Sequence, residues 1–350
     1  MARKVRVGII GSGGIATAAH MPGYKADPDC EIVAVCDVNP EAARKAADKF
    51  EVPKTYSDYR ELAADDDIEA VSVCTPNFMH KEPTVACLEA GKHVIVEKPI
   101  ARDAKEGGEM VRAARKAKKL LAVGLHFRYD PKVNAIRRFF DKKGFGDVYY
   151  ARVHALRRRG IPSWGVFGDK EKQGGGPLID IGVHMLYATM YAMGFPEPVA
   201  VSGQTYQKFG TKKPGVAPWG PWDHKGFTVE DYASAFVRFE GGASLVIEAS
   251  FCMNGPDGMN FWIMGDKGGA QYSPLKFYRE EFGTLTDAEP GWLPKVKCHT
   301  QQMLDFVNAV RGKGKVGVTG EEGLCITRIL DAIYASAEGG TEVPVEKLDA

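Results

Sequence analysis

The chain has 350 residues, which is long for one compact core, so two domains are expected. Its 46 basic and 45 acidic side chains give a formal net charge of +1 without a long basic run, which argues against a nucleic-acid-binding protein. No stretch reaches the ~18 apolar residues of a membrane-spanning helix, and we expect no signal peptide. The seven cysteines form no C-x-x-C pair, which favours reduced core residues and a cytoplasmic location. The histidines lack metal-ligand spacing, so no metal is expected.

The first part of the chain alternates strand-like and helix-like patterns. Apolar β-branched runs predict buried strands at Val5–Ile10, Glu31–Cys36, Ala70–Cys74, His93–Glu97 and Leu120–Gly124. Helical patterns lie between them, beginning with an alanine-rich one after the first strand and continuing at Pro40–Phe50, Lys81–Ala90 and Ala104–Lys118. Asn39 is the expected N-cap of the Pro40–Phe50 helix. This alternation predicts an α/β domain of the Rossmann type at residues 1–124, with a parallel, doubly wound sheet.

After Gly124 the pattern changes to long alternating segments. Strands are predicted at Asp147–Leu156, Pro198–Gln207, Tyr232–Phe239, Ala243–Phe251, Asn260–Met264 and Gly269–Tyr278, and helices at Ile179–Met193, Thr300–Arg311 and Glu321–Ser336. Residues 125–350 are therefore expected to form an α+β domain with a large open, mainly antiparallel sheet. Helices can cover one face of such a sheet and a second subunit the other, so a homo-oligomer is expected. The Gly-, Pro- and Trp-rich stretch Phe209–Phe227 is predicted to be a long loop.

The first strand runs into a glycine-rich turn with the form G-x-G-x-x-A, the dinucleotide-binding fingerprint. Gly11 permits the tight turn, Gly13 allows close approach of a pyrophosphate, and Ala16 allows the helix to pack on the sheet. The helix N-terminus offers free N–H groups to phosphates. We therefore expect cofactor contacts from Gly11, Ser12, Gly13, Gly14 and Ile15.

Asp37 ends the second predicted strand, about 20 residues after the turn. A carboxylate there accepts hydrogen bonds from the adenosine ribose and repels a 2′-phosphate, which favours NAD over NADP. The alternative is an aspartate that merely caps a turn. Thr75, Pro76 and Asn77 close the third strand, where loops of open α/β sheets face the ligand crevice, although a purely structural turn is equally compatible.

Three polar residues form a candidate catalytic set. Lys98 follows the fourth strand, where its ammonium could stabilise a developing alkoxide, although a surface lysine beside a turn proline is the simpler interpretation. Asp180 and His184 are four residues apart and share a face if the segment is helical. A carboxylate beside an imidazole suits a general base that takes a hydroxyl proton. An isolated pair of this kind is also a common capping or surface feature.

Together these motifs resemble the Gfo/Idh/MocA family, the glucose–fructose oxidoreductase and inositol dehydrogenase group. The resemblance rests on Val7–Ala16, Cys74–Asn77, Gly91–Pro99 and Gly175–His184 and extends over essentially the whole chain. It implies a Rossmann domain, an open-sheet domain, a substrate pocket between them, and dimers or tetramers that pair the open sheets.

The resemblance also implies roles for single residues. Lys98 would hold the reacting oxygen, His184 would accept the proton, and Asp180 would orient His184. Glu97 would lie near the nicotinamide ribose, and the cofactor would further be lined by Thr75, Pro76, Asn77, His80 and Lys98. The substrate-binding set expected on this basis is Lys98, His126, Arg128, Trp164, Asp180 and His184.

One segment departs from the pattern of inositol-type members. His126 and Phe127 stand where a basic or amide side chain is frequent, whereas Arg128 is retained. The substrate therefore does not transfer from inositol dehydrogenases. Trp164, Trp219 and Trp222 could stack on a sugar face, or simply pack within their loops.

Three functions remain open at this point. The leading one is an NAD-dependent dehydrogenase that acts on a hydroxyl carbon (CH–OH) of a sugar, glycoside or polyol. The second keeps NAD bound as an internal redox relay for epimerisation, elimination or glycoside cleavage. The third, a nucleotide or sugar sensor, is disfavoured because the catalytic set is intact. The sequence reveals neither the sugar nor the hydroxyl that reacts.

Overall fold

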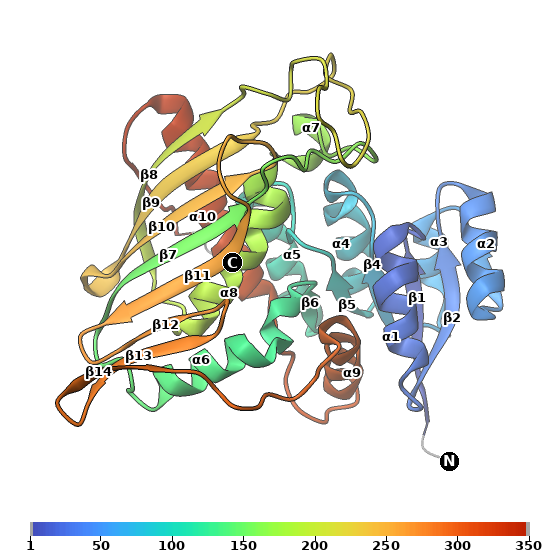
Figure 1. Ribbon diagram of the computed structural model, residues 1–350. Helices are drawn as coiled ribbons and strands as arrows, with labels where there is room; N and C mark the ends of the chain where they lie inside the picture. The colour runs from blue at the N-terminus through green and yellow to red at the C-terminus, as the bar shows by residue number, and fades with distance from the viewer. Residues whose placement is uncertain (1–2, 348–350) are drawn as a thin grey trace. The chain divides into compact units, whose positions relative to one another are not determined.

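The structure is a computed structural model that describes residues 3–347 (Figure 1). The chain divides into two compact units that interleave in sequence. We call them the Rossmann unit (residues up to 126, with 297–327) and the sheet unit (127–296, with 328–347). The expected division at residue 124 is thus close to the first boundary, but residues 297–327 pack with the N-terminal part rather than with residues 125–296.

The Rossmann unit contains a parallel sheet with the strand order β3-β2-β1-β4-β5-β6. Its strands are β1 (Val5–Ile10), β2 (Cys30–Cys36), β3 (Lys54–Tyr56), β4 (Ala70–Val73), β5 (His93–Val96) and β6 (Leu121–Val123). This is the order of a doubly wound dinucleotide-binding fold. All the predicted strands are present to within a residue or two. Strand β3 was not predicted, because it is three residues long and none of its residues is buried.

Helices surround this sheet: η1 (Ala16–His20), α1 (Met21–Lys25), α2 (Pro40–Phe50), α3 (Tyr59–Ala64), η2 (Asn77–Met79), α4 (Lys81–Glu89), α5 (Ala104–Ala117), α9 (Cys298–Val310) and the first part of α10 (Gly320–Gly339). The predicted cap is confirmed, because the Asn39 side chain accepts hydrogen bonds from the backbone N–H groups of Glu41 and Ala42. The short helix η3 (His126–Tyr129) leads into the sheet unit.

Helix α9 is part of the Rossmann core. Met303, Phe306 and Val307 are buried in the same cluster as residues of β1, β2 and α1. Gly23 of α1 allows this approach, since a Cβ at that position would lie 2.6 Å from the Met303 side chain. A helix far along the chain thus completes the first hydrophobic core, because an apolar helical stripe carries no information about which sheet it will cover.

The sheet unit contains one large sheet, ordered β14-β13-β12-β11-β7-β10-β9-β8-β15. Its strands are β7 (Val148–Leu156), β8 (Pro198–Tyr206), β9 (Tyr232–Phe239), β10 (Ser244–Ser250), β11 (Gly258–Gly265), β12 (Gly269–Gln271), β13 (Lys276–Glu281), β14 (Thr284–Ala288) and β15 (Val343–Pro344). Strands β7 and β10 run parallel and the other described pairs antiparallel, which confirms the open, mainly antiparallel sheet.

One strand prediction was wrong. The segment Gly269–Tyr278 is not a single strand but two, β12 and β13, which pair with each other in antiparallel register. Ser273 and Pro274 lie in the turn between them. Proline cannot donate a backbone hydrogen bond to a ladder, so the chain reverses there instead of continuing.

The helices of the sheet unit are α6 (Pro131–Asp141), α7 (Lys170–Gln173), η4 (Leu178–Gly182), α8 (Val183–Ala192), η5 (Glu240–Gly242) and the second part of α10. Helix α8 packs on β7 and β11, and η4 packs on β10. The second part of α10 reaches β8, where the backbone N–H of Gly203 donates to the Ser336 hydroxyl at 2.9 Å. Helices α8 and α10 and the turn η4 lie on one face of the sheet, which places the segment 178–184 there (Figure 1).

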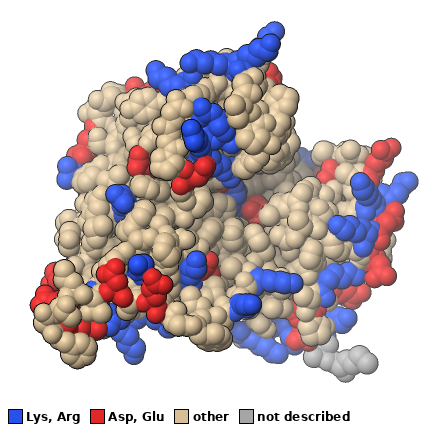
Figure 2. All heavy atoms as spheres, viewed as in Figure 1, with Lys and Arg blue, Asp and Glu red and all other residues tan. Residues whose placement is uncertain are grey.

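Acidic and basic side chains lie beside one another over the surface of the Rossmann unit (Figure 2), in ion pairs such as Arg3–Glu69 and Lys54–Asp65. Between residues 3 and 347, no helix is long and apolar enough to cross a bilayer. In the same described range, no group of three or more His, Cys, Asp or Glu side chains could hold a metal ion.

Candidate active site

The glycine-rich turn has one packed glycine and two open ones. Gly11 has φ +88°, and a Cβ there would lie 2.8 Å from the carbonyl group of Cys74 at the end of β4. At Gly13 and Gly14 an added Cβ would meet nothing within 4 Å. The turn therefore closes tightly against the sheet on one side and leaves bare backbone on the other. That is the arrangement a dinucleotide pyrophosphate requires, so the residues fit the predicted cofactor.

Asp37 ties this turn to the end of β2. Its Oδ2 accepts hydrogen bonds from the backbone N–H and the hydroxyl of Ser12, at 2.8 and 2.7 Å, and its Oδ1 accepts from the Asn39 N–H at 2.9 Å. The carboxylate thus has the structural role considered in the sequence analysis. It also keeps about one acceptor position, on Oδ1, for a ribose hydroxyl, because an ionised carboxylate offers about four acceptor sites and three are used here.

His80 connects two loops at the carboxyl edge of the sheet. It is fully buried, and its Nδ1 and Nε2 lie 2.8 and 2.9 Å from the carbonyl oxygens of Pro99 and Thr75. Burial lowers the pKa of His80, against the opposing effect of these two carbonyls. The Thr75 hydroxyl in turn donates to the Met79 carbonyl at 2.7 Å. As a neutral imidazole, His80 donates to only one of the two carbonyls, and its ring packs between the Thr75–Asn77 loop and the loop that carries Lys98.

Glu97 forms a buried pair with a histidine that the motifs did not indicate. His20 of η1 lies with Nε2 2.8 Å from Glu97 Oε1, and its Nδ1 lies 3.1 Å from the Ser72 hydroxyl. Burial alone lowers the pKa of His20, but contacts with Cys74 and Glu97 raise it to about 10. Burial conversely raises the pKa of Glu97, and the hydrogen bond and charge of His20 bring it below its ordinary value. At neutral pH this is a buried ion pair.

Lys98 follows this pair directly. Its backbone N–H donates to Glu97 Oε2 at 3.2 Å, and its side chain is partly exposed. The room for Glu97 depends on Gly124 at the end of β6, where a Cβ would lie 2.5 Å from Glu97 Oε1. The position of Lys98 is therefore set by a packed, hydrogen-bonded turn rather than by a free loop.

His126 stacks against a second unpredicted histidine, His299 of α9. The ring centroids are 4.0 Å apart and the planes are inclined by 35°. Burial, reinforced by the neighbouring His299, lowers the pKa of His126 to about 4. Burial also lowers the pKa of His299, so both rings are neutral near pH 7. The Rossmann unit thus holds Glu97, Lys98, His126 and His299 within electrostatic range of one another.

In the sheet unit, Asp180 and His184 lie on one helical segment. Asp180 is in the π-helical turn η4, and His184 is in the first turn of α8. The predicted helical spacing is confirmed, and single π turns are frequent at functional sites. The ring of Phe127 lies 5.8 Å from that of His184. This π turn has no sequence signature that periodicity could reveal.

A buried carboxylate holds the start of this segment. Glu230 accepts hydrogen bonds from the backbone N–H groups of Gly176 and Leu178, at 2.9 and 3.2 Å, and from the Tyr334 hydroxyl at 2.8 Å. A Cβ on Gly175 would collide with the Tyr334 hydroxyl. Gly175 and Gly176 therefore allow the backbone before η4 to approach Tyr334 and Glu230 closely.

The remaining predicted substrate residues have clear local contacts. The Arg128 guanidinium lies over the Tyr191 ring at 3.9 Å, which fixes it against α8. Trp164 is 56% exposed and sits beside Trp219. Arg157, which the sequence analysis did not single out, lies 3.7 Å from Asp180.

Comparison with known families decides the assignment. Residues 5–125 match the model described as "Oxidoreductase family, NAD-binding Rossmann fold", and residues 141–346 match that of its "C-terminal alpha/beta domain". The chain belongs to the Gfo/Idh/MocA oxidoreductase family. It is therefore an NAD-binding oxidoreductase, as predicted.

Several family members resemble most or nearly all of the chain. A D-glucoside 3-dehydrogenase of Escherichia coli (strain K12) is 38% identical over 97% of both chains. A levoglucosan dehydrogenase of Pseudarthrobacter phenanthrenivorans is 30% identical over 76% of this chain and 73% of its own. Among solved structures, a levoglucosan dehydrogenase in complex with NADH has a TM-score of 0.85 at 26% identity, covering 99% of this chain and 100% of its own.

Proposed function

We propose that this oxidoreductase oxidises a ring hydroxyl of a glycoside or a closely related sugar, with NAD as the cofactor. The observation that carries the proposal is the presence of Lys98, Asp180 and His184 in a chain 38% identical, over nearly its full length, to a D-glucoside 3-dehydrogenase. The similarity to levoglucosan dehydrogenases supports the same substrate class.

In this proposal the polar residues divide the reaction between them. Bound NAD supplies the acceptor for the hydride that leaves the hydroxyl carbon. His184 takes the hydroxyl proton, Asp180 orients the imidazole and binds a neighbouring hydroxyl, and the Lys98 ammonium holds the reacting oxygen as negative charge develops on it. Asp37 and the backbone from Gly11 to Ile15 hold the dinucleotide.

The first experiment follows absorbance at 340 nm with NAD and NADP separately, across glucosides, anhydrosugars and inositols. NADH formation with glucosides supports the proposal, and a preference for NADP would contradict the role of Asp37. If no sugar gives NADH, and nucleotide is still bound to the protein after extensive dialysis, the bound-cofactor relay would be favoured instead.

Replacing Lys98 with Met tests the catalytic assignment. Removing the ammonium should lower kcat by roughly 100-fold or more, because one preorganised charge donor to a developing oxyanion contributes on this scale. NAD affinity, measured by calorimetry, should change little. Lys81→Met, which removes a partly exposed lysine paired with Glu109 at the start of α4, is the control. An active Lys98 variant would refute the assignment.

We also propose that the protein is a homo-oligomer through the open face of its sheet. On β9, β10 and β11 alternate residues are buried, while Phe236, Val246 and Trp262 are only partly covered. The strand register places these three in one row across the sheet, with Arg152 between Val246 and Trp262. The cytoplasmic location stays a prediction that rests on the cysteines.

A further inference from the structure

Two exposed tryptophans form a pair on the sheet unit. Trp164 and Trp219 are 56% and 40% exposed, and their ring centroids are 5.7 Å apart with planes inclined by 35°. Phe167 meets Trp164 edge-on at 6.4 Å. Large exposed aromatic surface of this kind is unfavourable in water, so a contiguous patch marks a binding site more often than a single exposed ring does.

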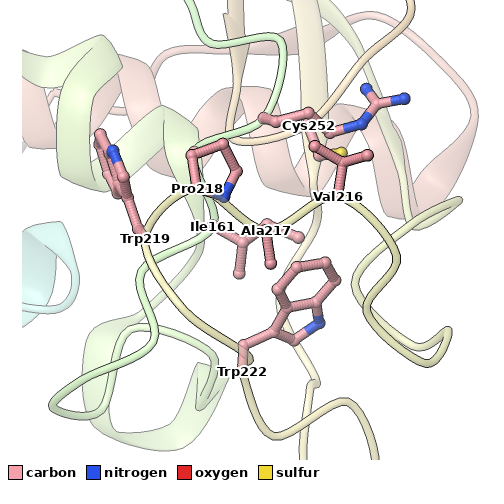
Figure 3. A pocket seen from close by; sticks show the side chains of 9 residues that line it. Ile161, Val216, Ala217, Pro218, Trp219, Trp222 and Cys252 are labelled. Carbon is pink, nitrogen blue, oxygen red and sulfur yellow. The ribbon is translucent and has the colours of Figure 1, made fainter.

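The loop that carries Trp219 is pinned. The Trp222 indole N–H donates to the Gly210 carbonyl at 2.7 Å, and the Ser163 hydroxyl donates to the Trp219 carbonyl. Figure 3 shows Trp222 facing Ala217, whereas the Trp219 ring points to the other side of the loop. The cavity between them measures only about 10 Å³, roughly the room for one water molecule. Trp222 thus anchors the loop, and Trp219 is presented outward.

Arg157 connects this aromatic pair to Asp180. Its guanidinium lies over the Trp219 ring, 4.6 Å from the centroid, and 3.7 Å from the Asp180 carboxylate. Burial lowers the pKa of Arg157 while the charge of Asp180 opposes this. The indole pair therefore lies one guanidinium group away from the proposed catalytic carboxylate, within the same unit.

We propose that Trp164 and Trp219 form a subsite for the ring carried on the anomeric oxygen of a glycoside, an aromatic or sugar aglycone, while the ring to be oxidised binds at Asp180. This inference rests on the proposed function. A flat apolar ring face is what an indole pair recognises, and Arg157 fixes the distance between the two subsites. The protein should therefore prefer glucosides with a ring aglycone to those with a small one.

The test is equilibrium binding of 4-nitrophenyl and methyl glucosides, in both anomers, to the NADH-loaded protein by calorimetry. The wild-type protein should bind the nitrophenyl compound more tightly. Trp219→Ala should weaken that binding by about 2- to 12-fold, the range expected for one aromatic contact, and the double variant with Trp164→Ala by more. The loss for methyl glucoside should be much smaller.

Trp292→Ala is the matched control, because Trp292 is 79% exposed and lies outside this cluster. Quenching of tryptophan fluorescence by the nitrophenyl glucoside, reduced in Trp219→Ala but retained in Trp292→Ala, gives a second readout. Equal wild-type affinity for the two glucosides, or equal losses for both in the variants, would overturn the subsite. Absence of NADH formation with every sugar would instead overturn the proposed function, since these binding measurements do not depend on turnover.

Discussion

Gly11 and Gly13 are two residues apart in the same turn, yet the structure requires them for different reasons. Gly11 has a left-handed backbone and packs against the Cys74 carbonyl, whereas Gly13 faces open space. Gly11 is thus required for the turn to fold, whereas Gly13 leaves room for the ligand. The fingerprint motif already assigned the tight turn to Gly11 and the pyrophosphate approach to Gly13. It could not indicate the packing partner of Gly11, because Cys74 is 63 residues away in the chain.

Replacing each of the two glycines with alanine should therefore cause a different defect, one in stability and the other in NAD affinity. Gly11→Ala should lower the free energy of unfolding by a few kcal/mol, of the order of 1–3 for the strained backbone alone. Gly13→Ala should retain wild-type stability and lose NAD affinity, because the Cβ occupies the pyrophosphate approach. Chemical denaturation and calorimetric titration measure the two effects. Stable Gly11→Ala protein would contradict the packing argument.

The His20–Glu97 pair makes a pH-dependent contribution to stability. Since the folded-state pKa of His20 is raised from 6.5 to about 10, its contribution is complete below pH 6.5 and disappears as pH rises through 10. The lowered pKa of Glu97 gives a contribution that is present above its ordinary pKa and lost as pH falls through the folded value.

Substituting His20 with Gln should therefore flatten the pH dependence. Between pH 6.5 and 9.5 the unfolding free energy of the wild-type protein should fall relative to the variant by up to about 1.4 kcal/mol per pH unit, the limit for one proton. Urea denaturation at several pH values gives the difference directly. His93→Gln serves as control, because burial lowers the pKa of that histidine instead. If the unfolding free energies of the wild-type protein and the His20→Gln variant change with pH in parallel, His20 is not charged in the folded protein.

At the scale of elements, local signals predicted most boundaries well. Asn39 and Pro40 mark the start of α2 by chemistry that acts within four residues. The buried run of β1 and the alternation of β9 each carry their own pattern. The failures have local causes as well. Strand β3 is too short and exposed for a pattern. The Ser273-Pro274 pair is a turn signal that lay inside the segment predicted as one strand.

Glu230 holds the start of η4 in place, although it lies more than 50 residues further along the chain. Without its carboxylate, two backbone N–H groups at the start of η4 and the Tyr334 hydroxyl lose their acceptor in a buried place. Glu230→Ala should cost about 2–3 kcal/mol of unfolding free energy and lower kcat by displacing Asp180. Glu230→Gln, which keeps one carbonyl oxygen, should lose less of both. Denaturation measures the change in stability, and steady-state rates measure the change in kcat. An unchanged kcat in Glu230→Ala would show that Glu230 does not position the catalytic residues.

At the scale of the whole molecule, the residues that the sequence could not indicate are those whose partners come from far along the chain. The catalytic and cofactor candidates sit in recognisable short motifs. His20, His299, Arg157 and Glu230 do not, because each acquires its meaning from a neighbour that only the fold brings close. Motifs therefore supplied the candidate residues of the site, and the structure adds the neighbours that position those candidates.

The open face of the sheet gives the prediction for assembly. Phe236→Asp places a charge in the row with Val246 and Trp262, where a subunit interface would bury it unpaired. Light scattering after gel filtration should show a dimer or tetramer for the wild-type protein and a smaller species for the variant, with unchanged circular dichroism. Val38→Asp, at an 87% exposed position of the Rossmann unit, is the control. A monomeric wild-type protein would exclude the oligomer.

Helix α9 also governs when the protein can fold. The core of the N-terminal unit includes Met303, Phe306 and Val307, so it stays incomplete until the ribosome has made more than 300 residues. At translation speeds of roughly 5–20 residues per second, the βα segments emerge many seconds before their last helix. In that interval α1 keeps its apolar side uncovered at Gly23. The dinucleotide-binding half is thus finished late in synthesis, although it is encoded first.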